Sequence, residues 1–401
     1  MGGFVLVGYD VRANAERCDS FPRGPAYAHG LQPSKRETTM NKKTLALLFL
    51  AVSACMPITD PAAVPPPAAA GADSHALVPT NIILVVGDGF GFSHLTTASL
   101  ILDKSMRMKE MPVAGIVETR SASSLVNDSA AGASAMATGV KANNRVLSLD
   151  PAGTAHQTVL ERGEALGKST GLITTSVFWD ATPAAFASHV ASRYEAEEII
   201  AQMLSSGAEF IAGAGLGKFG IEGRPAVEDV ASAAGYTLVR SRAELEEARG
   251  RRTLVVLPET RHEIESPELP LATLATKAIE LLAGDPEGFF LLIENEGIDG
   301  ASHANVTEDV LASIRSFDAA VGVALDFAAG DGNTLVIVTA DHETGGMQLY
   351  AKDGQLDIRW GTTGHTGAAV PLLAYGPGAE AFAGLLDNTD IAKRIFGYWG
   401  Q

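Results

Sequence analysis

Five short apolar runs constrain the fold of this chain more than any other feature. They are NIILVV at 81–86, TGLITTSV at 170–177, GFFLLI at 288–293, TLVIVT at 334–339 and VPLLAY at 370–375. Stretches with helical spacing, for example 195–204 and 307–327, separate them. Continuous apolar strands that alternate with helices are typical of a mainly parallel sheet covered on both faces. We therefore predict an α/β fold with a mainly parallel central β-sheet and helices on both faces.

Polar side chains with metal-binding chemistry follow nearly every one of these strands, at the place where such sheets bind ligands. The set comprises Asp88, Asp180, Thr182, Glu294, Asp299, His303, Asp341, His342 and His365. Taken singly, an aspartate after a strand is commonly a helix cap, and a lone histidine is a satisfied polar residue. Taken together, five carboxylates and three imidazoles at strand ends need cations to be tolerated. The sequence therefore predicts a site for several metal ions.

The types of these side chains indicate which metals they bind. Imidazole with carboxylate suits zinc, whereas an all-oxygen set that includes a hydroxyl suits magnesium. Two sets combine imidazole with carboxylate, namely Asp299 with His303 and His365, and Asp88 with Asp341 and His342. Glu294 and Thr182 remain for a hard cation. We expect two zinc ions and one magnesium ion.

The stretch VNDSAAGASAMATG at 126–139 predicts an unusually thin helix. Asp128 and Ser129 precede ten residues that include nothing larger than Met136. Alanine favours helix, and serine or aspartate is a typical first residue of one. Two explanations are open for the small residues. Either the helix packs closely against a sheet and Asp128 or Ser129 only caps it, or the helix places a functional hydroxyl at its positive end.

The first 55 residues do not read as part of a domain. We interpret residues 1–39 as a misassigned extension and Met40 as the true start. Residues 40–55, MNKKTLALLFLAVSAC, have the two lysines and short apolar run of a signal peptide and end at Cys55 in a sequence that resembles a bacterial lipobox. An ordinary cleaved signal with an incidental cysteine is the alternative. Residues 56–79 are a Pro/Ala-rich tether, which leaves 80–401 as one large domain.

Charge narrows the classes of partner. The chain has a formal net charge of −17 and no basic run, so we expect no nucleic-acid-binding role. Its acidity also disfavours an anionic substrate unless bound cations reverse the local field. Both cysteines, Cys18 and Cys55, lie before the domain, so an exported protein of this sequence has no disulfide in the domain.

The motifs together resemble the alkaline phosphatase family, in family order and over most of residues 80–401. They are GDG, DSAAGASAMATG, DATPAAFASHVASR, IENEGIDGASH, TADHETGG and GHTG. The resemblance implies hydrolysis of phosphate monoesters through a phosphoserine, with release of inorganic phosphate. The signal-like segment at 40–55 with its lipobox-like ending at Cys55 separately predicts export and a lipid anchor in the bacterial cell envelope, either facing the periplasm or in the outer membrane. The sequence determines neither the natural ester nor the oligomeric state, a homodimer being one option.

The resemblance also implies a role for each matching residue. Ser129 is the nucleophile, and Arg193 grips the phosphate. Asp299, His303 and His365 hold the first zinc, Asp88, Asp341 and His342 hold the second, and Asp88 reaches the magnesium with Thr182 and Glu294. Asp180 arranges the waters of the magnesium, and we interpret Asp128 as orienting Arg193. His189 is structural, on the helical segment that leads to Arg193.

Several features depart from better-known members of that family. Gly300 stands after Asp299 where relatives carry a larger side chain that touches phosphate. Glu294 and Glu296 compete for the magnesium role, and spacing from Asp299 favours Glu294. GAGLGKFG at 213–220 lacks the ending of a phosphate loop, so we interpret it as an ordinary turn.

Two rival functions remain at this point. A phosphodiesterase of the same superfamily would keep the fold, although such enzymes tend to use threonine and to lack an equivalent of Arg193. A phosphate- or metal-binding lipoprotein without catalysis would have no use for a nucleophile between metals. A sulfatase needs a C/S-x-P-x-R context that Ser129 lacks.

Overall fold

The computed structural model describes residues 78–215, 226–250, 252–258 and 266–400. The extension at 1–39, the signal peptide at 40–55 and nearly all of the tether at 56–79 lie outside the described residues, as does most of the 213–220 turn. Those interpretations therefore stay predictions. The described residues form the α/β domain presented below.

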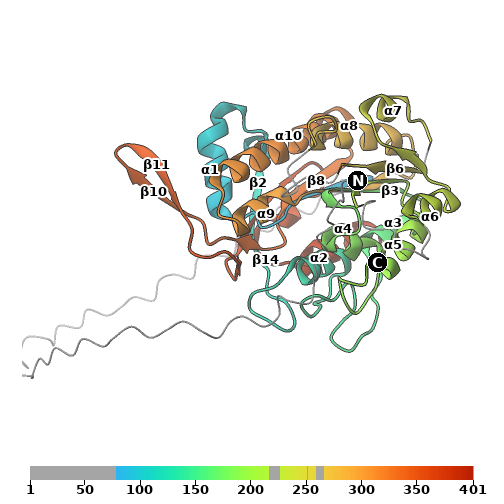
Figure 1. Ribbon diagram of the computed structural model, residues 1–401, viewed down its shortest axis with the longest axis horizontal. Helices are drawn as coiled ribbons and strands as arrows, with labels where there is room; N and C mark the ends of the chain where they lie inside the picture. The colour runs from blue at the N-terminus through green and yellow to red at the C-terminus, as the bar shows by residue number, and fades with distance from the viewer. Residues whose placement is uncertain (1–77, 216–225, 251, 259–265, 401) are drawn as a thin grey trace, which may run out of the picture. The chain divides into compact units, whose positions relative to one another are not determined.

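A ten-stranded sheet forms the centre of the domain (Figure 1), in the order β14-β2-β13-β8-β1-β7-β3-β4-β6-β5. Its strands are β1 (Asn81–Gly87), β2 (Val113–Glu118), β3 (Ser169–Val177), β4 (Phe210–Ala214), β5 (Thr237–Val239), β6 (Thr253–Val256), β7 (Phe289–Asn295), β8 (Thr334–Thr339), β13 (Val370–Tyr375) and β14 (Gly384–Asp387). Among these described strands, β13 alone runs against its neighbours. The prediction of a mainly parallel sheet is confirmed, and all five apolar runs are strands within it.

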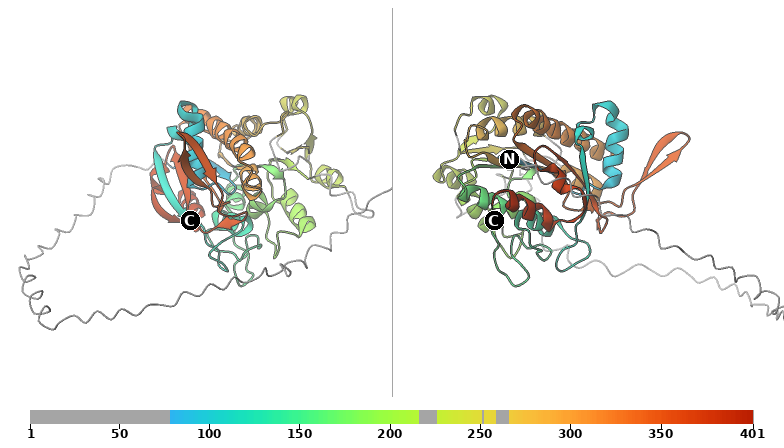
Figure 2. Two further views of the ribbon diagram at one scale, coloured as in Figure 1. Left: turned by 60° about the vertical axis from the view of Figure 1, so that its left-hand side comes forward. Right: turned by 180° about the vertical axis from the view of Figure 1, so that it is seen from behind.

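Helices cover both faces of the sheet (Figures 1 and 2). One face carries α8 (Leu271–Leu282) and α10 (Thr307–Asp331), which pack against each other. The other face carries α2 (Ser129–Thr138), α3 (Val159–Ala165), α4 (Ala181–Ala187), α5 (Ala196–Ser205) and α11 (Thr389–Tyr398). Because both faces are covered, every residue of β1, β7 and β8 is buried, which explains their unbroken apolar sequences.

The remaining elements lie at the rim of these layers. They are α1 (Phe92–Leu102), α6 (Val227–Ala233), α7 (Arg242–Glu247), α9 (Gly297–His303), short 3₁₀ turns at Asp103–Ser105, Arg107–Glu110 and Ala379–Phe382, and the strand pairs β9 (Glu343–Thr344) with β12 (His365–Thr366) and β10 (Gln348–Lys352) with β11 (Gln355–Arg359). The β10–β11 hairpin projects from the domain (Figure 1).

The register of the central strands brings their carboxyl ends level with one another. Val86 of β1 pairs with Glu294 of β7 on one side and with Thr339 of β8 on the other, and Glu294 pairs in turn with Thr174 of β3. The loops that follow these four strands therefore leave the sheet at one edge. Glu294 lies at the end of β7 itself, and the other predicted ligands lie on these loops, on the short helices that follow them, or on β12 beside them.

One local prediction is wrong. His189 is not in a helix, because α4 ends at Ala187 and the chain continues in extended form, with Val190 bridged to Leu147. The His189 ring lies against Glu161, with Nε2 2.8 Å from Oε1, and its Nδ1 lies 3.1 Å from the carbonyl oxygen of Ser148. These contacts fit the structural role expected for His189.

Candidate metal centre

Three side chains form a compact cluster at the end of β7. Asp299 and His303 are one turn apart on α9, and Asp299 Oδ2 lies 3.1 Å from His303 Nε2. His365, on β12, places its Nε2 3.1 Å from His303 Nε2 and 3.7 Å from Asp299 Oδ1. One ligand atom from each of the three lies within 4.8 Å of the other two. Ligands bound to a common zinc at about 2.0–2.2 Å lie this close together.

Hydrogen bonds on the outer side of the rings determine which nitrogen faces the cluster. His303 Nδ1 lies 2.6 Å from the carbonyl oxygen of Thr363, and His365 Nδ1 lies 2.9 Å from that of Asn127. A carbonyl oxygen can only accept, so each Nδ1 carries a hydrogen, and in the neutral, metal-binding form of each ring the lone pair is on Nε2, toward the cluster. This arrangement is the usual one for histidines that bind metals.

A second cluster lies deeper, between β1 and β8. His342 Nε2 lies 3.2 Å from Asp341 Oδ2 and 3.5 Å from Asp88 Oδ1. One ligand atom from each of Asp88, His342 and Asp299 lies within 4.8 Å of the other two, so Asp299 borders both clusters. Gly89, in the left-handed region with φ of +71°, allows the approach, because a Cβ there would lie 2.9 Å from Asp299 Oδ1.

Unpartnered buried oxygens show that these residues fit divalent cations. Asp88 Oδ1, Asp341 Oδ2 and Thr182 Oγ1 are buried and make no well-aligned hydrogen bond with the described residues, even though His342 Nε2 lies near the two carboxylates. Burial raises the pKa of Asp341 to about 7, and burial together with the other carboxylates raises the pKa of Asp88 well above its ordinary value. Carboxylates packed this closely without a counter-charge are costly, and bound cations supply that charge.

The third predicted set, whose ligands are all oxygens, lies beside the second cluster. Glu294 is the sixth residue of β7 and is buried, and Thr174 Oγ1 donates to its Oε2 at 2.5 Å. Burial, followed by the charge of Asp180, raises the pKa of Glu294 to about 8. The charge of Glu294 in turn raises the pKa of Asp88, so the two carboxylates lie near each other. Glu296 is the N-cap residue just before α9 and is partly exposed, with its Oε2 buried and without a hydrogen bond among the described residues.

Ser129 opens the thin helix and faces the second cluster. All ten residues of α2 are buried, and Asp128 caps it by accepting from the backbone N–H of Ala131 at 3.1 Å. Ser129 Oγ lies 3.3 Å from His342 Nε2. The positive end of a helix and a neighbouring cation both favour the deprotonated form of a hydroxyl.

Arg193 lies between two carboxylates on the segment that joins α4 to α5. Its Nη2 donates to Asp180 Oδ1 at 2.9 Å, and its Nη1 lies 3.5 Å from Asp128 Oδ2. The contact with Asp128 agrees with its expected orienting role. The contact with Asp180 was not expected, since the sequence assigned that residue to the magnesium alone.

The structure also brings three residues to the site that the sequence analysis missed. Thr344 Oγ1 donates to Asp299 Oδ1 and lies 3.2 Å from His342 Nδ1, while Asn127 and Thr174 make the contacts given above. Asn127 and Thr344 belong to the motifs VNDS and DHETGG, so their neighbours in the sequence were a signal. Nothing in the sequence shows that Thr174 contacts Glu294 rather than a core residue.

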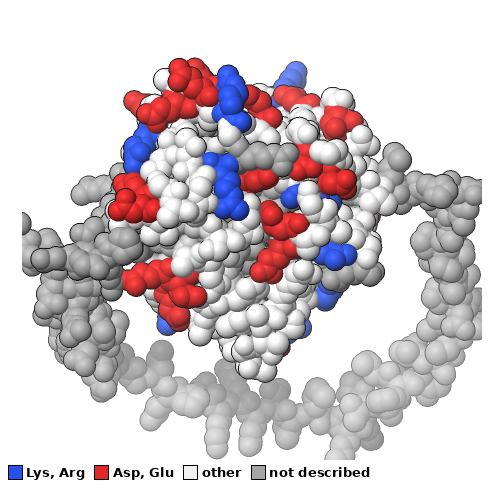
Figure 3. Space-filling model, turned by 90° about the vertical axis from the view of Figure 1, so that its right-hand side faces the viewer, with Lys and Arg blue, Asp and Glu red and all other residues white. Residues whose placement is uncertain are grey.

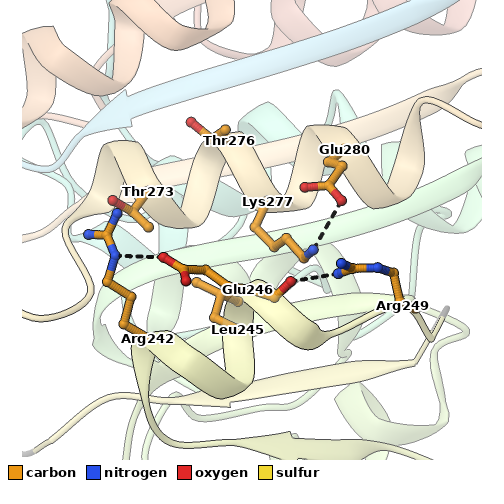
Figure 4. A pocket seen from close by; sticks show the side chains of 8 residues that line it. All are labelled: Arg242, Leu245, Glu246, Arg249, Thr273, Thr276, Lys277 and Glu280. Atoms are coloured by element: carbon orange, nitrogen blue, oxygen red, sulfur yellow. Dashed lines mark hydrogen bonds and ion pairs between the residues drawn. The ribbon is translucent and has the colours of Figure 1, made fainter.

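A pocket of about 320 Å³ lies apart from this site, between α7 and α8 (Figure 4). Its charged side chains already pair within it, Arg242 with Glu246 at 3.0 Å and Lys277 with Glu280 at 3.1 Å. The surface on that side of the molecule likewise intersperses acidic with basic groups (Figure 3). In the described part of the chain, no helix is both long and apolar enough to cross a membrane.

A serine at a helix terminus, facing carboxylate and imidazole clusters beyond a doubly covered sheet, defines a metal-binding hydrolase. A family model described as alkaline phosphatase matches residues 79–356. This chain therefore belongs to the alkaline phosphatase family.

Individual relatives agree with that family. Alkaline phosphatase 3 of Bacillus subtilis (strain 168) is 29% identical over 79% of this chain and 88% of its own length. Alkaline phosphatase of Escherichia coli (strain K12) is 31% identical over 78% of this chain and 84% of its own. The structure of alkaline phosphatase from the Antarctic bacterium TAB5 matches with a TM-score of 0.76 and 31% identity, covering 81% of this chain and 100% of that one. A mutant of that enzyme has Mg bound in its M3 site.

Proposed function

We propose that this enzyme hydrolyses phosphate monoesters through a phosphoserine at Ser129 and releases inorganic phosphate. The observation that carries the proposal is the position of Ser129 Oγ, 3.3 Å from His342 Nε2 at the start of a buried helix. A serine with a purely structural role would have no need of carboxylate and imidazole clusters beside it. The non-catalytic alternative therefore explains less of the site.

We further propose which residues hold the metals. Asp299, His303 and His365 hold one zinc, Asp88, Asp341 and His342 hold the second, and Asp88, Thr182 and Glu294 hold magnesium, with Asp180 arranging its waters. The support is the chemistry of the donors and the unpartnered oxygens of the second and third sets. When bound, these ions polarise the phosphoryl oxygens and favour ionisation of the attacking oxygen.

The protein's own residues account for the two steps of the reaction. Ser129 Oγ loses its proton and bonds to phosphorus, and the bond to the ester oxygen breaks as the alcohol leaves with a proton. Water then loses a proton as its oxygen bonds to phosphorus, and the bond from Ser129 Oγ to phosphorus breaks, so that Ser129 Oγ takes up a proton and inorganic phosphate is freed. Arg193, oriented by Asp180 and Asp128, offers two parallel N–H donors to the phosphoryl oxygens in both steps.

The same arginine favours a monoester over a diester. A monoester dianion presents three free oxygens and two negative charges, so two oxygens can accept from Arg193 while a third stays free, whereas a diester presents two free oxygens and one negative charge to the same guanidinium. The phosphodiesterase alternative gives the guanidinium less to bind.

Rates on three substrates test the proposal. The full chain is purified with its metals, the metals are measured, and hydrolysis of an aryl phosphate, a bis-aryl phosphate and an aryl sulfate is compared. We expect zinc and magnesium in the protein and a clear preference for the aryl phosphate. A preference for the bis-aryl phosphate would contradict the monoesterase proposal, and loss of all three activities with metals bound would favour a binding protein.

We propose, finally, that the enzyme is exported and anchored in the cell envelope by lipid at Cys55. The support is the sequence VSAC at 52–55 after a signal-like apolar run, followed by a tether long enough to hold a domain off a membrane.

A further inference from the structure

Asn127 joins three parts of the site without being one of its predicted ligands. It stands two residues before Ser129, and its side chain is buried, with 2% of the residue exposed. Its Nδ2 donates to the carbonyl oxygen of Asp341 at 3.0 Å, and its own carbonyl oxygen accepts from His365 Nδ1 at 2.9 Å. Asn127 therefore contacts both the loop that carries Asp341 and the segment that carries His365.

The absence of a side chain at Gly132 of α2 makes room for this contact. A Cβ at Gly132 would lie 2.8 Å from Asn127 Nδ2 and 2.9 Å from the carbonyl oxygen of Asp341. Real Cβ atoms do not approach other atoms so closely, so any larger residue at 132 would push the amide and the carbonyl away from the helix. Glycine is otherwise unfavourable in the interior of a helix, and its place here coincides with the point where the two loops meet.

The hydrogen bond between Asn127 and the Asp341 carbonyl is also suited to holding the backbone of that loop in place. The Asp341 carbonyl is an acceptor next to the clustered carboxylates, and the Asn127 amide meets it with a neutral donor that adds no charge. Moving that carbonyl would move Asp341 and His342 together, because they are consecutive residues. The distance from His342 Nε2 to Ser129 Oγ, 3.3 Å, would change with it.

We propose that Asn127 is a positioning residue that sets the distance between Ser129 and the Asp341–His342 pair. The absence of a Cβ at Gly132 leaves the space in which Asn127 contacts Asp341. This inference rests on the proposed function, in which Ser129 attacks and His342 binds metal. The side-chain amide supplies the bond to Asp341, and the backbone carbonyl holds His365 with Nε2 turned inward. Asn127 does not touch the reacting atoms.

Four variants of the full-length holoenzyme test the inference. Asn127→Ala removes the amide, Gly132→Ala inserts the Cβ, and the double variant combines them. Asn144→Ala is the matched control, because Asn144 also donates from Nδ2 to a backbone carbonyl, that of Val126 at 3.1 Å, but forms no hydrogen bond with the described loop that carries Asp341. The measurements are kcat/KM on an aryl phosphate, the rate of zinc release to a chelator, the visible spectrum of the Co²⁺-substituted protein and the Tm of the metal-free protein.

Positioning predicts one signature in three measurements. Asn127→Ala and Gly132→Ala should each lower kcat/KM on the order of 10- to 100-fold, speed zinc release and alter the Co²⁺ spectrum, as loss of an outer partner of a metal ligand does. The double variant should be little worse than the poorer single variant, because both changes break the same contact. The metal-free Tm of Asn127→Ala should match that of Asn144→Ala.

Two results would overturn the inference. One is an Asn127→Ala protein whose kcat/KM, zinc release and Co²⁺ spectrum all equal those of Asn144→Ala. The other is a loss of activity that follows a lowered metal-free Tm with the spectrum unchanged, which would mark a merely structural role. Zinc release and the spectrum need no turnover, so they judge the role of Asn127 even where Ser129 forms no phosphoserine.

Discussion

Arg193 donates from Nη2 to Asp180 Oδ1 at 2.9 Å, which ties the predicted phosphate clamp to a residue beside the predicted magnesium corner. Asp180 is itself held, because Ser176 Oγ donates to its Oδ2 at 2.6 Å. The charge of Asp180 also raises the pKa of Glu294. One carboxylate therefore lies between the arginine and the all-oxygen set, and a change at either partner should be felt by the other.

Arg193→Ala should weaken phosphate binding far more than metal binding. Each charge-assisted hydrogen bond to the oxyanion contributes about 1.5–3 kcal/mol, so we expect a loss of roughly 100-fold or more in monoesterase kcat/KM. Inhibition by inorganic phosphate should weaken as well, with metal content unchanged. Diester hydrolysis should fall less, because a diester has fewer free oxygens. Equal losses on both substrates would count against the clamp, and Arg315→Ala, at an exposed site on α10, provides the control.

Metal loading should release protons, and the number should fall as the pH rises. In the metal-free protein the hydrogen bond with Asp299 raises the pKa of His303 to about 9, while burial raises those of Glu294 and Asp341 to about 8 and about 7. These groups hold protons at pH 7 that bound metals displace, so we expect about two protons released per chain.

Calorimetry in buffers of different ionisation enthalpy measures that release. Above pH 10 all three groups have already lost their protons, so release at these positions should vanish. His303→Gln should lower the release at pH 7 by about one proton. A release that does not change between pH 7 and pH 10 would show that these groups are not displaced by metal.

The pair formed by His189 and Glu161 should make stability depend on pH. The hydrogen bond to Glu161 raises the pKa of His189 above its ordinary 6.5; burial alone would raise the pKa of Glu161, but the bond from His189 holds it below its ordinary 4.5. The contribution of His189 to the free energy of unfolding is full below pH 6.5 and is lost as the pH rises through the raised pKa of His189. The contribution of Glu161 to the free energy of unfolding is full above pH 4.5 and is lost as the pH falls through the lowered pKa of Glu161.

His189→Gln should therefore destabilise the protein most between about pH 4.5 and pH 6.5. Since both side chains are partly exposed, we expect a difference of about 1 kcal/mol in the free energy of unfolding between pH 6 and pH 9.5. Urea unfolding at the two pH values measures it, with Glu161→Gln and the double variant completing the cycle. The same cost at both pH values would show that the pair carries no charge.

Cys55→Ala should move the protein from the membrane fraction to the soluble fraction. A lipidated cysteine followed by the tether would hold the domain at a bilayer, and removal of its thiol removes the attachment point. Cell fractionation measures the change, and Cys18→Ala should leave the distribution as it was if translation starts at Met40. A Cys55→Ala protein that stays with membranes in the same amount would contradict the anchor.

The sheet and the thin helix could be predicted because both depend on local patterns. Continuous apolar runs mark strands buried on two faces, and the carboxyl ends of parallel strands meet at one edge, so Asp88, Glu294 and Asp341 were expected together before any contact was known. The capping role of Asp128 follows from the same local chemistry.

What the sequence could not show depends on contacts between distant segments. That Asp180 turns to Arg193, and that Thr344 joins Asp299 to His342, depends on side-chain directions that periodicity does not determine. His189 was expected on a helical segment, whereas α4 ends at Ala187 and the His189 ring contacts Glu161 and the carbonyl oxygen of Ser148, both distant in the sequence. Gly132 reads as one more small residue until the amide of Asn127 is seen beside it.

Labelling of Ser129 by phosphate tests the central claim most directly. The metal-loaded enzyme is incubated with labelled inorganic phosphate at mildly acidic pH, where a phosphoenzyme would accumulate, and the modified residue is identified after denaturation. Ser124, an exposed serine five residues upstream, provides the control variant Ser124→Ala. We predict label on Ser129 in the parent and in Ser124→Ala. In Ser129→Ala we predict no label, normal metal content and a monoesterase rate lower by orders of magnitude. A parent enzyme without label on Ser129, or a Ser129→Ala protein with full activity and normal metals, would contradict the nucleophile assignment.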